Sequence, residues 1–399
     1  MKTRLFILPF LILFGHQASQ AQLQNLVFDF FGEPIEIPAI TRINLPENES
    51  FSPEAITNFV NQLESVDYSP LIRSLLEIRE RDQLDDWLFY QLIRKTAGSI
   101  SPKSANYPQY TLYKWFLLTR SGYEASIRVS AGKILFYVRT DDKIFNLPAY
   151  NKNGQQFVCL NYHDYGNSID FAAESFGELK LAVPDISRSF SYKITRLPSF
   201  NSKTYEEKDI RFNYYQNDFH FTIKLNPNVR TIFANYPVVD YASYFNIPLS
   251  QETYRSLIPL LRKNISKMSV KSGVDYLMRF TRYAFLFKTD SENFGDEKRL
   301  SPEQTLLYPE SDCEDRAALF FYLVKEIYNL PMIVMAYPRH VTIAVKFDKP
   351  VGRPIIYNGE KYSVCEPTPQ QEDLAIGELL PSLSKAGYEV VYAYQPLQR

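Results

Sequence analysis

The stretch 311–324 constrains the fold of this chain more than any other. It begins with a run of polar residues and continues with apolar residues at helical spacing. Ser311, followed three residues later by Glu314, is typical of a capping box at the start of a helix. The pattern predicts a helix with Cys313 in its first turn, where unpaired backbone N–H groups and the helix dipole favour a thiolate. Glu314 and Asp315 oppose this effect, because nearby carboxylates raise the pKa of a thiol, so a reactive Cys313 needs a base.

His340 is the candidate base. It opens a run, 340–345, whose β-branched residues alternate as they do in strands. A turn at Asn358-Gly359 precedes a second predicted strand, which ends at Glu366 because a proline follows. A helix start and two neighbouring strands would thus bring a thiol, an imidazole and a carboxylate together. In such a site the imidazole takes the thiol proton and the carboxylate orients the imidazole.

These motifs resemble the bacterial transglutaminase-like superfamily: Cys-Glu-Asp at a helix start, a His on a strand, and an acidic residue before Pro-Thr. The resemblance covers residues 270–370. It departs in one place, since the family usually has Asp where this chain has Glu366, and one extra methylene still permits a hydrogen bond to the imidazole. The resemblance implies an α+β, papain-like fold in which the Cys-bearing helix packs on an antiparallel sheet. It also implies catalytic roles for Cys313, His340 and Glu366.

The resemblance further implies a reaction on amide bonds. Cys313 would attack the carbonyl of a peptide or protein substrate to give a thioester, and water or an amine would then resolve it. Water makes the enzyme a cysteine protease or amidase, which we favour for a bacterial relative, and an amine makes it a transglutaminase. No cofactor or metal is required. The alternative is a non-catalytic scaffold of the same fold that binds a peptide or glycan in its cleft.

An internal repeat supports two copies of this unit. Subtracting 207 from the numbering of the candidate site superimposes similar apolar patterns. Leu319, Tyr322 and Leu323 fall on Leu112, Trp115 and Phe116, and 341–345 falls on 134–138. Cys313 and His340 fall on Asn106 and Lys133, and with a one-residue slip Glu366 falls on Leu160. We therefore expect a degenerate transglutaminase-like domain without a triad, although chance similarity between two helix–strand units is the alternative.

The expected organisation follows the chain in five parts. They are a signal peptide at 1–21, an extended lead-in at 22–51, the degenerate domain at 52–165, a β-rich connecting region at 166–245, and the catalytic domain at 246–399. The connecting region has alternating patterns that predict strands at 189–196, 208–215 and 219–225.

The first 21 residues are typical of a signal peptide, with Lys2 and Arg4 before an apolar run and a small residue, Ala21, at the cleavage site. The run is too short to span a bilayer, and no later stretch is long and apolar enough. We therefore expect an exported protein, periplasmic or secreted, without a membrane span after cleavage.

Composition excludes several other functions. Removing the two basic residues of the signal peptide takes the formal charge from −1 to −3, which gives no electrostatic basis for binding nucleic acid. Few histidines and no Cys-x-x-Cys pair argue against a metal site. With three cysteines at least one thiol is unpaired, and Cys313 is the expected one; a bond between Cys159 and Cys365 stays open. Oligomeric state is not indicated. For the oxyanion, Tyr283 is one candidate donor beside the backbone N–H of Cys313.

Overall fold

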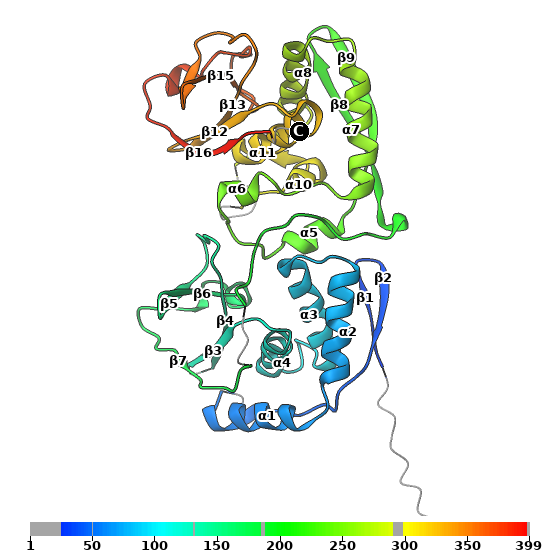
Figure 1. Ribbon diagram of the computed structural model, residues 1–399, viewed down its shortest axis with the longest axis vertical. Coiled ribbons are helices and arrows are strands. Elements are labelled where there is room, and N and C mark those ends of the chain that lie inside the picture. Colours follow the sequence, from blue (N-terminus) through cyan, green and yellow to red (C-terminus); the bar gives the residue numbers. More distant parts are fainter. Residues whose placement is uncertain (1–24, 50, 131, 185–187, 290–297, 397–399) are drawn as a thin grey trace, which may run out of the picture.

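The computed structural model describes residues 25–49, 51–130, 132–184, 188–289 and 298–396. The predicted signal peptide at 1–21 lies outside these ranges. Within them the chain is mixed α+β, as expected, with ten α-helices and two five-stranded antiparallel sheets. One sheet lies in each half of an elongated molecule (Figure 1). Residues 25–184 form the first half and residues 206–396 the second.

The first half places helices against one antiparallel sheet. Its elements are β1 (Leu26–Phe30), β2 (Glu33–Ile37), α1 (Pro53–Ser65), α2 (Ser69–Arg81), α3 (Asp86–Ile100), α4 (Tyr107–Arg120), β3 (Ala125–Ser130), β4 (Lys133–Arg139), β5 (Ala149–Lys152), β6 (Gln155–Cys159) and β7 (Gly177–Glu178). The strand order is β5-β6-β4-β3-β7. Almost every residue of α4 is buried, so this helix is the core of the half. The lead-in, expected to be extended, contains the β1–β2 hairpin, and β1 contacts α3.

The second half repeats this plan. Its elements are β8 (Glu206–Tyr214), β9 (Asn217–Leu225), α5 (Asn228–Phe233), α6 (Tyr241–Tyr244), α7 (Gln251–Ile265), α8 (Val270–Tyr283), β10 (Leu286–Phe287), α10 (Pro302–Leu307), β11 (Glu310–Ser311), α11 (Cys313–Tyr328), β12 (Met332–Tyr337), β13 (His340–Val345), β14 (Ile355–Tyr357), β15 (Glu360–Cys365) and β16 (Glu389–Tyr394). The strand order is β14-β15-β13-β12-β16, which matches the first sheet strand for strand. Helix α11 contacts β13 and carries Cys313 at its start.

The connecting region is divided between the two halves. Strand β7 joins the first sheet, whereas the β8–β9 hairpin packs on α7 and α8 of the second half. The prediction of a strand at 189–196 is wrong. Phe190, Tyr192 and Ile194 are buried as alternation requires, but carboxylates rather than a neighbouring strand accept the hydrogen bonds of several N–H groups. These carboxylates belong to Asp85, Asp86 and Asp142.

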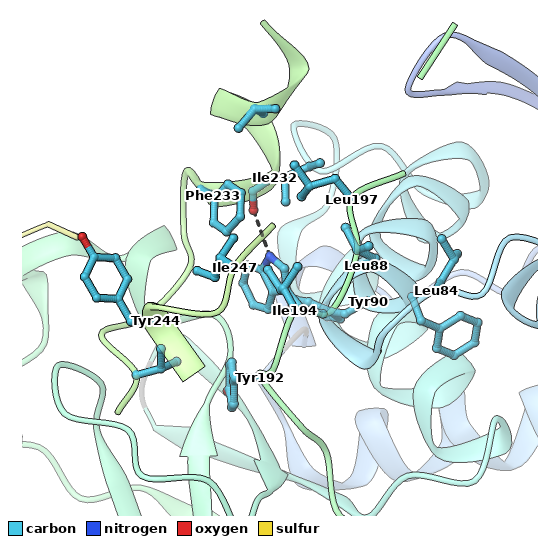
Figure 2. Packing of buried hydrophobic residues seen from close by; sticks show 14 of the residues in the cluster. Leu84, Leu88, Tyr90, Tyr192, Ile194, Leu197, Ile232, Phe233, Tyr244 and Ile247 are labelled. Carbon is cyan, nitrogen blue, oxygen red and sulfur yellow. Dashed lines mark hydrogen bonds between the residues drawn. The ribbon is translucent and has the colours of Figure 1, made fainter. Parts of the chain in front are cut away.

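The two halves share one apolar core where they meet. Figure 2 shows residues of the first half, among them Leu84 and Leu88, beside Ile232 and Phe233 of α5. The indole N–H of Trp87 donates to the carbonyl of Ile232 at 2.9 Å across this junction. Burial of large apolar groups on both sides holds the halves in one arrangement.

A second contact between the halves reaches the start of α11. In the loop before β5, the N–H of Phe145 donates to the carbonyl of Val238 at 3.1 Å. The next carbonyl, that of Val239, accepts from Arg299 at 2.8 Å, and the same guanidinium pairs with Glu314 at 2.8 Å. A loop of the first half is thus three contacts away from the residue that follows Cys313.

Candidate active site

Helix α11 begins at Cys313 itself. The side chain of Asp312 is the N-cap and accepts from the N–H groups of Glu314 and Asp315 at 3.0 and 3.2 Å. Asp315 in turn accepts from the N–H of Asp312 at 3.3 Å, which completes a capping box. The expected box of Ser311 and Glu314 is therefore wrong by one residue, because Ser311 pairs with Phe287 in the short β10–β11 sheet. The first N–H of the helix, that of Cys313, has no carbonyl of the helix to bond to.

His340 and Glu366 contact each other. His340 is the first residue of β13, and its Nε2 lies 2.8 Å from Oε2 of Glu366, which directly follows β15. The carboxylate is 1% exposed, and its other oxygen accepts from the N–H of Thr368 at 2.9 Å. The guanidinium of Arg282 holds the backbone carbonyl of Glu366. Because a carboxylate only accepts, Nε2 carries the proton, and Nδ1 is left with its lone pair.

Cys313 and His340 line one cleft of about 830 Å³. The backbone N–H of Val341, the residue after His340, is close enough to the Cys313 thiol to lower its pKa. The sulfur therefore lies beside the start of β13, which is the strand that carries the imidazole. The cleft is lined by Phe287, Thr289, Asp312, Cys313, Glu314, Tyr337, Pro338, Arg339, His340, Thr368, Pro369, Gln370, Leu380, Ser382, Leu383 and Ala386.

The surroundings of the thiol oppose its ionisation. Burial raises the pKa of Cys313 well above its usual range, and the charges of Asp312, Glu314 and Glu366 raise it further. The nearby N–H of Val341 acts in the other direction. Without a base the sulfur is therefore a thiol at neutral pH, which is the situation in which a neighbouring imidazole is needed.

Two buried arginines fix the backbone around the site. Arg316, on the first turn of α11, donates to backbone carbonyls from the end of α8 through β10 and β11. The acceptors are Thr281, Arg282, Phe285, Leu286 and Ser311. Burial lowers the pKa of Arg316 to about 10, which still leaves it charged at neutral pH. Arg282 bonds to Asp373 at 2.6 Å as well as to the carbonyl of Glu366, and so ties the chain after β15 to α8.

The remaining candidates lie elsewhere. Tyr283 is 39% exposed, donates to Asp373 at 2.7 Å and does not line the cleft, so the structure does not support it as an oxyanion donor. Cys159 and Cys365 are buried, Cys313 is partly exposed, and all three are free thiols, so no disulfide joins them. No group of His, Cys, Asp and Glu that could hold a metal ion occurs in the described ranges.

Two lining residues were missed by sequence reasoning. Tyr337 pairs directly with His340 across the β12–β13 hairpin, and Thr368 follows Glu366 by two residues. The hairpin offered a signal for Tyr337, because a two-residue turn at Pro338-Arg339 places the flanking residues opposite each other. Thr368 lies in the Pro-Thr motif but carried no assigned role.

The strand pairing also corrects the match between the halves. In the first half, Val138 pairs with Val158, which lies 20 residues later in the chain. In the second half, the matching Val345 pairs with Ser363, which lies 18 residues later. The first half has two more residues in this connection. Asn161, not Leu160, therefore stands where the second half has Glu366.

Comparisons with family models, with curated proteins and with solved structures found no match to this chain. No helix of the described part is both long and apolar enough to cross a bilayer.

Proposed function

We propose that the second half is a transglutaminase-like, papain-like domain and that the protein is an exported cysteine-dependent enzyme acting on amide bonds of a peptide or protein. The observation that carries this proposal is the contact of Glu366 with Nε2 of His340, which leaves Nδ1 available in the cleft that also holds Cys313. The first half is then a second copy of the domain that has lost the catalytic groups.

The reaction begins with proton transfer. Nδ1 of His340 takes the thiol proton, and the sulfur of Cys313 forms a bond to the substrate carbonyl carbon. The C–N bond then breaks as His340 returns the proton to the leaving amine, which gives a thioester and a free amine. Glu366 stabilises the imidazolium between these steps. Water attacks the thioester, gives a proton to His340, and releases a carboxylic acid as the thiol re-forms.

The oxyanion that forms at each attack needs donors. The backbone N–H of Cys313 is one, since the first N–H of a helix has no partner within the helix. The positive end of the α11 dipole adds to its effect. Hydrolysis is preferred over transamidation, in line with the resemblance to bacterial transglutaminase-like proteins.

The test is alkylation of the purified protein with iodoacetamide at pH 5 to 10, followed by mass spectrometry. Cys159 and Cys365 are fully buried, so the folded chain offers one reactive thiol. We expect Cys313 to react well below pH 8 and Cys313→Ala to take up no label. In His340→Ala, reaction should require a much higher pH. Equal rates with and without His340 would contradict the proposed base.

The second candidate is a scaffold that binds a peptide or glycan without cutting it. The raised pKa of the Cys313 thiol favours this reading, because an unassisted thiol in these surroundings is unreactive. A Cys313 that resists iodoacetamide up to pH 9 in the folded protein would support the scaffold.

A further inference from the structure

Two hydroxyl groups in the wall of the cleft have no hydrogen-bond partner. They are Oη of Tyr337 and Oγ1 of Thr368, each enclosed by protein and unpaired within the described residues. The side chains belong to residues only 6% and 3% exposed, and both residues line the cleft. A buried polar atom without a partner costs about 1–3 kcal/mol, so two at one site call for an explanation.

Both hydroxyls lie on the imidazole side of the site. Tyr337 is the direct neighbour of His340 on the adjacent strand, and Thr368 donates its N–H to the carboxylate that holds His340. The sulfur, at the start of α11, lies near the N–H of Val341, the residue after His340. A substrate amide that spans the site has its acyl part bonded to the sulfur and its amine part next to the imidazole that protonates it.

The chemistry of the two groups selects for a hydrogen-bonding ligand. Burial raises the pKa of Tyr337 to about 12, with smaller contributions from Tyr388 and Glu366, so its hydroxyl keeps its proton at all relevant pH values. A phenol and an alcohol can both donate to the same acceptor, and a peptide carbonyl oxygen has two lone pairs.

The segment before β16 packs against the apolar cluster to which Tyr337 belongs. Leu383 and Ala386 line the cleft and also pack against the apolar cluster that contains Tyr337. This segment has only one short helical turn, Pro381–Leu383, and no strand. A ligand that displaces it disturbs few backbone hydrogen bonds.

We propose that the hydroxyls of Tyr337 and Thr368 bind the carbonyl oxygen of the residue on the amine side of the cleaved bond. This wall of the cleft is then the leaving-group site, and the enzyme requires an amide carbonyl next to the amine that it releases. The inference rests on the proposed function and specifies its substrate, which is an internal peptide bond rather than the amide of a simple alkylamine.

Acyl transfer tests this directly, because an amine that attacks the thioester occupies the leaving-group site. p-Nitrophenyl acetate acylates Cys313, with an S–C bond formed, a C–O bond broken and p-nitrophenol released. Glycinamide, which has an amide carbonyl, or propylamine, which has none, then competes with water for the acetyl group. Chromatography gives the ratio of acetylated amine to acetate for each.

We expect Tyr337→Phe to lower the ratio for glycinamide about three- to tenfold, which corresponds to one hydrogen bond, and to leave the ratio for propylamine unchanged. Thr368→Val should do the same. Tyr388→Phe is the matched control, since its ring lies 5.5 Å from that of Tyr337 but does not line the cleft.

An unchanged glycinamide ratio in both variants, or an equal fall for both amines, would overturn the leaving-group site. In each of these cases acylation of Cys313 still proceeds and the proposed function stands. Absence of Cys313-dependent release of p-nitrophenol in the wild type would instead overturn the proposed function together with this inference.

Discussion

The two halves have sheets of the same strand order, but the polar side chains around the start of the central helix differ between them. In the second half, Cys313 opens α11 beside a cleft in which two hydroxyls are unpaired. In the first half, α4 opens with Tyr107 after the N-cap Asn106, and the groups around it bond to one another. In the first half, the side chains at the places of His340 and Glu366 are hydrogen-bonded to neighbours, whereas the hydroxyls of Tyr337 and Thr368 in the cleft wall are not.

The closed arrangement in the first half is specific. Asn161, at the place of Glu366, donates to the hydroxyl of Tyr107 at 2.8 Å. That hydroxyl donates to Asp164 at 2.8 Å. Lys133, at the place of His340, bonds to Glu174 at 2.6 Å. Each group that matches a proposed catalytic residue is thus held by a neighbour, which stabilises the fold and leaves no nucleophile.

The comparison shows which features separate the candidate site from its counterpart in the first half. Fold and strand order are the same in both halves, so they do not distinguish them. What differs is the set of side chains at the matching positions. The second half has a thiol, an imidazole and a carboxylate beside a cleft, and the first half has Asn106, Lys133 and Asn161 bonded to neighbours.

Replacing His340, the proposed base, should have the largest effect on the alkylation rate of Cys313. His340→Ala is expected to slow alkylation of Cys313 at pH 7 by about 100-fold or more, since general bases contribute about 10²–10⁴-fold. Lys133→Ala, at the matching position, should leave the rate unchanged. Stopped-flow or mass-spectrometric rates provide the measurement, and a similar loss in both variants would contradict the assignment.

Loss of the buried arginine should destabilise the second half. Arg316→Met leaves five backbone carbonyls without their donor, and each buried one costs about 1–3 kcal/mol. We expect the free energy of unfolding in urea to fall by at least about 3 kcal/mol. Arg255→Met, on the exposed face of α7, should change it by less than about 0.5 kcal/mol. Equal effects would show that Arg316 is dispensable.

The charge on Glu366 should matter more than its shape. In Glu366→Gln the oxygen can still accept from Thr368, so the amide group faces Nε2 of His340 and forces the proton onto Nδ1. That tautomer cannot take the thiol proton, and alkylation at pH 7 should slow about tenfold to hundredfold. Glu303→Gln, another fully buried carboxyl of this half, should leave the rate as it is.

The stability of the first half should depend on pH through one buried lysine. Burial lowers the pKa of Lys114 on α4 from 10.5 to about 7. The matching position on α11 is Phe321. Between these values the unfolded chain binds a proton that the folded chain does not, so stability rises with pH across this window. Lys114→Met should be more stable than the wild type at pH 6, and this advantage should be clearly smaller at pH 9. Urea midpoints at both pH values check this, and a constant difference would contradict it.

Periodicity and turn chemistry predicted much of the second half. Helix α11, strand β13 and the Asn358-Gly359 turn all follow from local patterns. The cap at Asp312 was not predicted, because Ser311 pairs with Phe287 in the β10–β11 sheet, and these residues are far apart in sequence. The false strand at 189–196 has the same origin, since its N–H groups bond to carboxylates from distant segments.

For the candidate site, the sequence predicted a contact that the structure contains, between His340 and Glu366. The match of Glu366 to Leu160 failed because a two-residue difference in loop length moves the register without a mark in the sequence. Unpaired hydroxyls are likewise invisible in a sequence, because whether a buried tyrosine or threonine finds a partner depends on the packing of several elements.

The contact from the Phe145 loop through Val239 and Arg299 to Glu314 links the surroundings of Cys313 to the first half of the chain. A chain cut between the halves would lose this support and would expose the apolar surface around Trp87 to water. Neither half is therefore expected to keep its native structure when it is produced alone.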